Sequence, residues 1–281
     1  MRSLLLLACV ACGSSSRPTA APVLPKPVET PPTIDEVRAV VRDAYTQLGQ
    51  GYDSVYLEGL TQDARLTIAG VRPEDLLSGY DASRAIEVHR LFGDAEIELV
   101  SKELEVHLAR DGTAAWIADD LSYRVLSGRR RAFLPLRETA LYERREGRWR
   151  LLGEALSYPI HDPALAASGL WKLTASTGLG EEGDLVKRRI IAVLTGDDSA
   201  VSLEDDALVI GPADERAHGR EVGKIATPAS FFPARGAIEP TGIRVALARS
   251  GTVAWAAATF VFAGAKTTSA RASFVLEKRG G

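Results

Sequence analysis

Two stretches of the chain are nearly the same: "LARDGTAAWIADDLSYRV" over residues 108–125 and "LARSGTVAWAAATFVFAG" over residues 247–264. In each of them a tryptophan, Trp116 or Trp255, follows a glycine-containing turn at the same spacing. A turn of this kind before alternating apolar residues is typical of a β-hairpin. The recurrence therefore predicts that one folding unit occurs twice in the chain.

The likeness continues on both sides of the two hairpins. Downstream, Arg137 and Glu143 match Arg271 and Glu277. Upstream, two further pairs of segments match, "TIDEVRAVVRDAYTQL" (33–48) with "DLVKRRIIAVLTGDD" (184–198), and "TQDARLTIA" (61–69) with "EDDALVIGP" (204–212). We therefore predict a tandem duplication; the alternative is that two hairpins are alike by coincidence.

Composition limits the classes of function. The chain has 281 residues, a formal net charge of -3, and 46% hydrophobic residues, enough for one or two domains with cores of their own. The near-neutral charge predicts no nucleic-acid partner. Its 4 histidines are scattered and both cysteines lie near the start, so we expect neither a metal site nor a cofactor.

The first residues, "MRSLLLLACVACGSSSR", predict a targeting segment. Their apolar run is much shorter than the roughly 20 residues that cross a bilayer. The segment resembles a bacterial lipoprotein signal, which implies a signal peptide over residues 1–12 and lipid attachment at Cys12. Cys9 would leave a shorter apolar core, and an ordinary cleaved signal is the other alternative. Gly13, after the cysteine, implies the periplasmic face of the outer membrane in the cell envelope.

Residues 13–33 are rich in Ser, Pro and Ala and predict a flexible tether. The folded part then begins near Ile34, where apolar residues recur at helical spacing over 34–48. Thr33 and Glu36 form the pattern of a capping box at the start of this helix. We expect one domain over 34–160 and a degenerate second copy over 161–281.

The first half places helices before strands. We expect helices over 54–60 and 81–92, and strands over 64–70, 95–100, 104–112, 113–126, 133–147 and 148–157. This order predicts an α+β fold, with two cone-like domains, each a curved antiparallel sheet with helices packed on one face.

The residues from Ile34 to about Ile160 resemble the SnoaL-like branch of the nuclear transport factor 2 superfamily. The resemblance is carried by "TQDARL", "GYDASRAI", "DGTAAW" and "YERREGRWRLLGEALS". It implies a cone-shaped fold with a pocket between helices and sheet, and pairing through sheets, hence an intramolecular pseudo-dimer here. It implies no particular reaction, because this scaffold serves isomerases, cyclases, hydrolases and binding modules. Gly153 and Ala155 stand where the family often has histidines, which weakens the enzyme interpretation.

Asp119 is the candidate for chemistry, because strand alternation places it in an apolar row with Ile117, Leu121 and Tyr123. Desolvation there would raise its pKa toward the range of a general base. Tyr45, Tyr56 or Tyr123 would donate to an oxyanion, and the other pocket candidates are His89 and Arg137. The alternative is structural: Asp119 binds backbone at a bulge or pairs with Arg137. The second copy has Ala258 at this place, which predicts packing instead of catalysis.

Two other segments allow specific hypotheses. "GLGEEG" (178–183) matches a dinucleotide-binding spacing, but its two acids would face the pyrophosphate, so a loop is expected. "GLWKLTAST" (169–177) is similar to "GRWRLLGEA", and Leu170 to Ala175 would then pair beside the strand 273–277 in a circularly permuted copy; a plain linker is the alternative.

Together these patterns predict a lipid-anchored envelope protein with two SnoaL-like domains that binds a small apolar ligand or serves in assembly, without catalysis. The alternative is a proton-transfer enzyme, similar to an isomerase or a cyclase, that uses Asp119 as general base.

Overall fold

The computed structural model describes residues 31–50, 53–71, 76–83, 85, 96–127, 130–159, 170–173, 180–194, 208–210, 216–218, 243–263 and 268–279. All of them belong to one compact unit, Pro31–Gly281. The predicted signal peptide, Cys12 and nearly all of the tether lie outside the described residues. The predicted boundary at 160/161 and most of the predicted helix 81–92, His89 included, lie outside them as well.

Helix α1 (Ile34–Gly49) begins where its capping pattern predicts. The side-chain oxygen of Thr33 accepts a hydrogen bond from the backbone N–H of Glu36 at 3.2 Å. This bond satisfies one of the amide groups that the first turn leaves without a helical partner. The residues Val37, Val41 and Tyr45 form the buried stripe of the helix. Helix α1 therefore presents a tyrosine, as well as aliphatic side chains, to the protein interior.

The first sheet is built from seven strands. Their order is β2-β1-β7-β6-β5-β3, and β4 also pairs with β5. Their bounds are β1 (Thr67–Ala69), β2 (Leu76–Ser78), β3 (Glu96–Ser101), β4 (Glu105–Leu108), β5 (Ala114–Ser127), β6 (Arg130–Arg145) and β7 (Arg148–Ser157). Strand β1 runs parallel to β7, whereas the other pairs are antiparallel, so the sheet is mixed at this edge.

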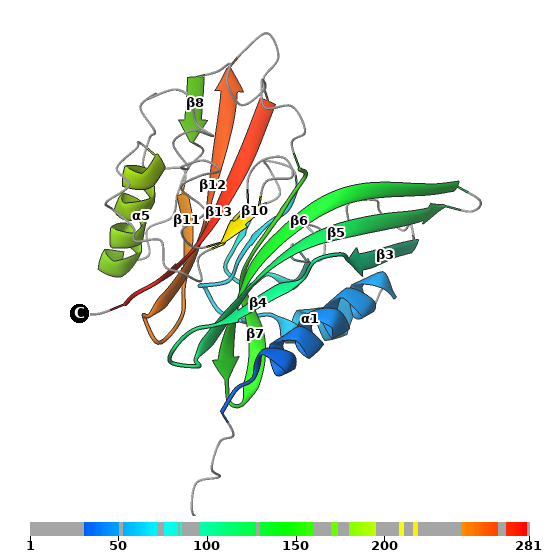
Figure 1. The fold of residues 1–281 in the computed structure, drawn as a ribbon, viewed down its shortest axis with the longest axis horizontal. Coiled ribbons are helices and arrows are strands. Elements are labelled where there is room, and N and C mark those ends of the chain that lie inside the picture. The colour runs from blue at the N-terminus through cyan, green and yellow to red at the C-terminus, as the bar shows by residue number, and fades with distance from the viewer. Residues whose placement is uncertain are drawn as a thin grey trace, which may run out of the picture. The chain divides into compact units, whose positions relative to one another are not determined.

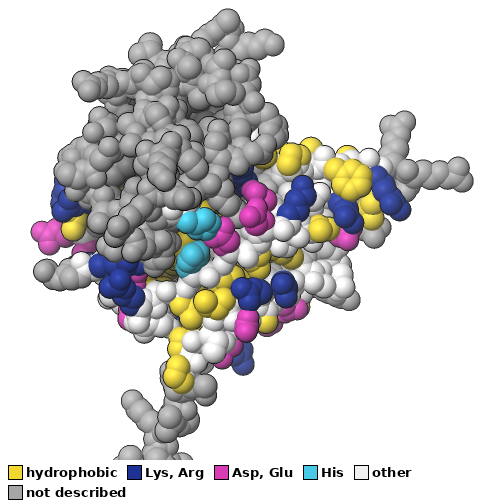
Figure 2. Space-filling model, in the orientation of Figure 1, with side chains coloured by type: hydrophobic (Ala, Val, Ile, Leu, Met, Phe, Trp, Pro, Cys, Tyr) yellow, Lys and Arg dark blue, Asp and Glu magenta, His cyan; other side chains and the backbone are white. Residues whose placement is uncertain are grey.

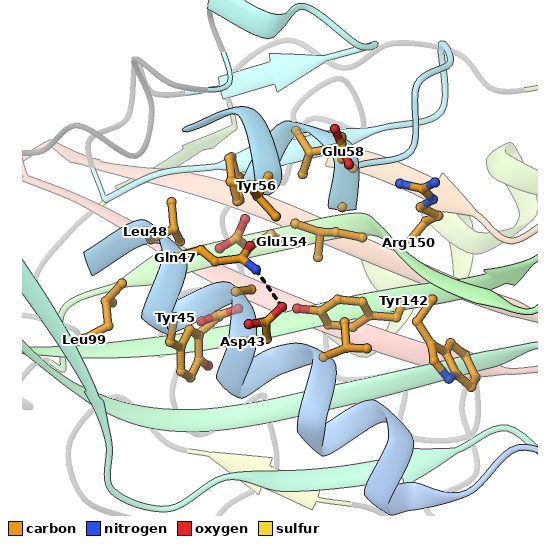
Figure 3. Close-up of a pocket in the computed structure, with 18 of the residues that line it drawn as sticks. Asp43, Tyr45, Gln47, Leu48, Tyr56, Glu58, Leu99, Tyr142, Arg150 and Glu154 are labelled. Carbon is orange, nitrogen blue, oxygen red and sulfur yellow. Dashed lines mark hydrogen bonds between the residues drawn. The ribbon is translucent and has the colours of Figure 1, made fainter. Parts of the chain in front are cut away.

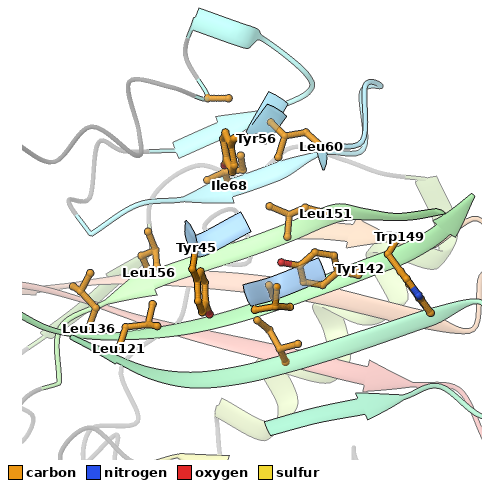
Figure 4. Close-up of a cluster of buried hydrophobic side chains, with 14 of the residues drawn as sticks. Tyr45, Tyr56, Leu60, Ile68, Leu121, Leu136, Tyr142, Trp149, Leu151 and Leu156 are labelled. Atoms are coloured by element: carbon orange, nitrogen blue, oxygen red, sulfur yellow. The ribbon is translucent and has the colours of Figure 1, made fainter. Parts of the chain in front are cut away.

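Helix α1 packs on one face of this curved sheet (Figure 1), and α2 (Asp53–Gly59) contributes Tyr56 to the core on the same face. The core between them holds side chains from both helices and from the strands, as Figure 4 shows. Its largest fully buried members include Leu60, Ile68, Ile117 and Leu136. The α+β class with a curved sheet, predicted from the element order, is therefore confirmed. No helix among the described residues is long and apolar enough to cross a membrane.

The second sheet has four strands, in the order β11-β12-β13, with β8 also paired to β12. These strands are β8 (Leu170–Leu173), β11 (Ile243–Leu247), β12 (Val253–Ala263) and β13 (Thr268–Glu277). Helix α5 (Gly180–Leu194) packs on this sheet through Ile190, against a cluster that includes Ala258. Strands β9 (Leu208–Ile210) and β10 (Arg216–His218) form a separate pair. Helix α5 begins at Gly180, within "GLGEEG", where a loop was expected.

The two similar hairpins have the same register. Ala114 lies opposite Glu143 in the first sheet, and Val253, its match in the sequence, lies opposite Glu277 in the second. The turn glycines of the two copies have φ of 67° at residue 112 and 69° at residue 251, a conformation that glycine adopts without strain. The sequence match of the hairpins is thus also a match of backbone geometry.

The expected position of the 170–175 segment is wrong. Strand β8 pairs with β12, where Trp171 lies opposite Phe262, while β13 pairs with the other edge of β12. Phe262 matches Tyr123, which lies opposite Leu99 of β3. Strand β8 therefore takes the place that β3 has in the first sheet, although it precedes its helix in the chain while β3 follows α1.

The two sheets are in contact through their faces away from α1 and α5. An apolar cluster joins Leu141, Leu152 and Ala155 of the first sheet to Trp255 and Ala246 of the second. A methyl group on Gly153 would lie 2.8 Å from the Trp255 ring, so only glycine fits there without a shift. This close approach explains a glycine inside a strand.

Polar contacts between the sheets are reciprocal. The backbone N–H of Arg249 donates to Glu143, and that of Arg110, which matches Arg249 in the sequence, donates to Glu277, which matches Glu143. The hydroxyl of Thr139 donates to that of Ser273, and these two residues also match each other.

A charged cluster lies beside these contacts. Glu143 is buried and is paired with Arg65 and Arg145, which also pair with Asp63. Burial opposes ionisation of Asp63, but hydrogen bonds from Arg65 and Arg145 lower its pKa to about 2. For Glu143 likewise, these bonds outweigh burial and lower its pKa. Both carboxylates are therefore charged when the two sheets pack.

Candidate functional site

A cavity of about 220 Å³ lies between helices α1 and α2 and the concave face of the first sheet. Its apolar lining includes Val40, Leu48, Leu60, Leu99, Leu136, Leu151 and Leu156. Its polar and aromatic lining comprises Asp43, Tyr45, Gln47, Tyr56, Glu58, Tyr123, Glu138, Tyr142, Arg148, Trp149, Arg150 and Glu154. Figure 3 shows how Tyr45, Tyr56, Tyr142 and Glu154 are gathered around it.

Glu138 reaches the cavity because of strand alternation in β6. Leu136 and Ala140, two residues to either side, belong to the core beneath the helices, so the intervening Glu138 projects the same way. The flanking residues Arg137 and Thr139 point to the opposite face, where Thr139 meets Ser273. A single glutamate thus sits in an otherwise apolar row.

Glu154 reaches the cavity through an irregularity in β7. The pairing shifts so that Leu141 lies opposite Gly153 while Tyr142 lies opposite Leu151, which leaves Leu152 as an extra residue. A bulge of this kind reverses which residues of a strand face the core. Leu151 and Glu154 consequently share the cavity side, whereas Gly153 faces Trp255 of the second sheet.

Three carboxyl groups lie close together on adjacent strands. Asp119 of β5 is directly opposite Glu138 of β6, and Glu154 of β7 is opposite Ala140, two residues from Glu138. Their exposed fractions are 0% for Asp119, 4% for Glu138 and 3% for Glu154. Burial, then the charge of Glu154, raises the pKa of Glu138 well above its ordinary value, against a hydrogen bond from the Tyr45 hydroxyl. This part of the sheet therefore favours a protonated Glu138 over a row of three charged carboxylates.

The tyrosines around these carboxyl groups remain neutral. Burial raises the pKa values of Tyr45, Tyr56 and Tyr142 well above 10.0, and the neighbouring acidic groups add to the effect. Burial, with a smaller effect of Tyr158, raises the pKa of Tyr123 to about 12. Neutral phenols can donate hydrogen bonds to a ligand and also offer it aromatic surface.

The structure places Asp119 under the helices, where alternation predicted it. Burial raises its pKa, against hydrogen bonds from Ser101, Glu103 and Tyr45 that lower it. Its Oδ1 accepts the backbone N–H of Glu103, at 3.2 Å, in the link between β3 and β4. Asp119 is not among the residues that line the cavity. The backbone contact is the structural alternative that the sequence left open.

The other candidates fall into three groups. Tyr45, Tyr56 and Tyr123 all line the cavity. His89 lies outside the described residues. Arg137 does not line the cavity, since it lies on the other face of the sheet and its Nε donates to Asp120 Oδ1 at 3.1 Å.

Sequence reasoning missed Glu138 and Glu154. The signal for Glu138 was the same as for Asp119, because it too interrupts an apolar row, here Leu134, Leu136, Ala140 and Tyr142. For Glu154 no simple signal existed, since regular alternation from Trp149 and Leu151 would place Gly153 and Ala155 in the pocket and Glu154 outside it.

A second group of titratable residues lies on the surface. In Figure 2 histidine side chains lie beside acidic ones, and His107 and His218 approach Glu105 at 3.5 Å and 3.6 Å. The His107 ring also stacks on Trp116, with ring centroids 3.9 Å apart. Within the described ranges, no group of three or more His, Cys, Asp or Glu side chains could hold a metal ion.

Comparisons with known proteins found one family model and several similar solved structures. A family model described as a SnoaL-like domain matches residues 38–161. A candidate dehydratase of the NTF2-like family from Streptomyces avermitilis is similar over 45% of this chain and 97% of its own, with 14% identity and a TM-score of 0.40.

Two other solved structures are similar. For a protein with a cystatin-like fold from Caulobacter vibrioides, the values are 47% and 92% coverage, 18% identity and a TM-score of 0.38. An NTF2-like protein from Pseudomonas putida KT2440 is similar over 45% of this chain and 87% of its own, with 19% identity and a TM-score of 0.38. No curated protein matches the chain. The first half of the chain, over residues 38–161, is thus similar to SnoaL-like domains.

Proposed function

We propose that the first half of this protein binds a small, largely apolar ligand in the cavity beneath α1 and α2. The observation that carries the proposal is the position of Glu138 and Glu154, two buried carboxyl groups, among the buried aromatic and aliphatic side chains that line the cavity. A mostly apolar pocket with a few convergent polar groups is the usual form of a small-molecule site.

Binding fits the geometry better than proton transfer by Asp119. A general base must come within hydrogen-bond reach of the proton that it removes. Asp119 instead accepts the Glu103 N–H and does not line the cavity. The polar groups that do reach the cavity, Glu138 and Glu154, can hold and orient a ligand.

The test is calorimetric titration of the full chain with 2-phenylethanol, a neutral apolar probe. Ala44 lines the cavity from α1, and we expect Ala44→Phe to fill it and abolish binding. Ala39→Phe is the matched control, because Ala39 is exposed on the same helix and its variant should bind like the unmodified chain. Equal binding by the Ala44→Phe variant, or none by the unmodified chain, would contradict the proposal.

We also propose that the chain is a tandem duplication whose halves form an intramolecular pseudo-dimer. The matched register of the two hairpins supports it. So do the reciprocal bonds of Glu143 and Glu277, since a two-fold interface repeats each contact with exchanged partners. The second half is then a structural copy, with Ala258 at the place of Asp119 and an apolar cluster beneath α5.

We further propose that Cys12 anchors the protein to the bacterial envelope through lipid. The support is the sequence "LLLLACVACG" around it. Expression in a Gram-negative bacterium with radiolabelled palmitate should label the chain and should not label a Cys12→Ala variant. Equal labelling of the two chains would contradict lipid attachment at Cys12.

A further inference from the structure

The buried part of the cavity is acidic. Glu138 and Glu154 are each more than nine-tenths buried, while the cations that line the same cavity, Arg148 and Arg150, are exposed and half-buried. Figure 3 shows Arg150 at one end of the cavity, near Glu58.

The mouth of the cavity is balanced in charge, unlike its interior. The acids Asp43 and Glu58 lie there with the two arginines, Arg148 and Arg150. The acidic groups that the arginines of the lining do not balance are therefore the interior pair, Glu138 and Glu154. A cation bound beside Glu138 would favour the ionised form of this carboxyl group.

Aromatic rings surround this pair. Tyr45 comes from α1, Tyr56 from α2, Tyr123 from β5, Tyr142 from β6 and Trp149 from β7, and all five line the cavity. The faces of tyrosine and tryptophan rings attract cations through their quadrupoles, more strongly where water is excluded. The indole N–H of Trp149, 7% exposed, has no hydrogen-bond partner among the described residues.

Burial of carboxyl groups has a cost that a cation would offset. A buried carboxylate is unfavourable unless a positive charge or several donors compensate it. Two neighbouring carboxyl groups, Glu154 and Asp119, disfavour the charged form of Glu138, and the hydrogen bond from the Tyr45 phenol favours it. A positive group in the cavity would compensate the charge of a buried carboxylate, whereas these carboxyl groups would repel an anionic ligand.

We propose that the ligand of this cavity is a small organic cation, an ammonium group on an apolar frame, held by Glu138 and Glu154 and enclosed by the tyrosine rings. The inference rests on the ligand-binding function proposed above and adds the charge of the ligand. A cavity of about 220 Å³ has room for a primary or quaternary amine with a short hydrocarbon or a single ring.

The experiment compares matched probes on the full chain at a pH of about 7.5, where aliphatic amines are charged. Phenethylamine and 2-phenylethanol differ only in the terminal group, and calorimetry gives the affinity of each. We expect the amine to bind at least about tenfold more tightly, the scale of one charge-assisted hydrogen bond. A weaker or equal affinity of the amine, with the alcohol bound, overturns the cation inference and leaves the binding function. Binding of neither probe overturns both.

Variants locate the charge effect. Glu138→Gln should lower the affinity for phenethylamine about tenfold and change that for 2-phenylethanol by less than about twofold. Glu36→Gln is the matched control, because Glu36 is exposed on α1 and does not line the cavity, and it should leave both affinities within about twofold. An unchanged preference for the amine in a folded Glu138→Gln variant would overturn the assignment of this carboxyl. If that variant does not fold, Glu154→Gln serves for the same comparison.

Discussion

Single acidic residues interrupt the apolar rows of the first sheet at Asp119 and Glu138. Alternation along β5 predicted the burial of Asp119, and the same rule applied to β6 would have found Glu138. The role of Asp119 depends on a hydrogen bond from the backbone N–H of Glu103, a residue in the link between β3 and β4. Pairing of that kind depends on tertiary structure, so the sequence left base and structural roles both open.

Asp119 should behave as a structural acceptor. Asp119→Asn keeps an oxygen for the Glu103 N–H, and we expect it to cost less than about 1 kcal/mol of unfolding free energy. Asp119→Ala leaves the part-buried Glu103 N–H without this acceptor and should cost about 1–3 kcal/mol. Urea denaturation measures both. Equal losses for the two variants would contradict this role.

Glu138 should make stability depend on pH in a defined direction. Its pKa in the folded chain lies well above 4.5, so its stabilising contribution is complete below about 4.5 and is lost as the pH rises through the folded value. The Glu138→Gln variant has no such loss. We therefore expect its melting temperature, relative to the unmodified chain, to rise with pH from about 4.5 upward. A difference that is the same at every pH would show that Glu138 is not the group responsible.

At the scale of elements, regular periodicity predicted most of the fold and irregularity caused the errors. The apolar stripe and the capping box predicted α1, and the alternation of apolar residues predicted the long strands β5, β6 and β7. The extra residue Leu152 in β7 moved Glu154 into the cavity, and a bulge has no reliable signal in one sequence. Strand β8 was expected beside β13, but four residues carry too little pattern to choose between two edges of β12.

Gly153 tests the close approach of β7 to the second sheet. Gly153→Ala would place a methyl group against the Trp255 ring, and overpacking of this kind costs about 1–3 kcal/mol. The matched control is Gly59→Ala at the end of α2, where an added methyl group meets nothing within 4 Å. Thermal unfolding should show a lower melting temperature for the first variant alone. Similar values for both would mean that the sheets do not meet at this glycine.

At the scale of the whole molecule, two similar sheets pack through their outer faces. Matched residues of the two sheets exchange matched bonds, as they do across a two-fold interface, and this supports the pseudo-dimer proposed above. The expectation of a pseudo-dimer came from the resemblance to a superfamily whose members pair through their sheets, and the sequence could not give the contacts. In the second half, Ala258 stands at the place of Asp119.

The Thr139–Ser273 hydrogen bond tests this packing. A double-mutant cycle of Thr139→Ala and Ser273→Ala should give a coupling energy of about 0.5–1.5 kcal/mol in urea denaturation. The control cycle pairs Thr113→Ala with Ser273→Ala; Thr113 bonds Asp111 instead, so its coupling should be near zero. A negligible coupling in the first cycle would contradict the sheet-to-sheet contact.

The central claim is that the cavity under α1 and α2 takes up a small ligand. The most direct measurement is a titration of the isotope-labelled full chain with phenethylamine, followed through its amide NMR signals. We expect saturable shifts that are largest in α1, α2 and the central parts of β6 and β7, around Glu138 and Glu154. Shifts confined to the outer faces of the sheets, or no saturable shifts at all, would contradict the claim.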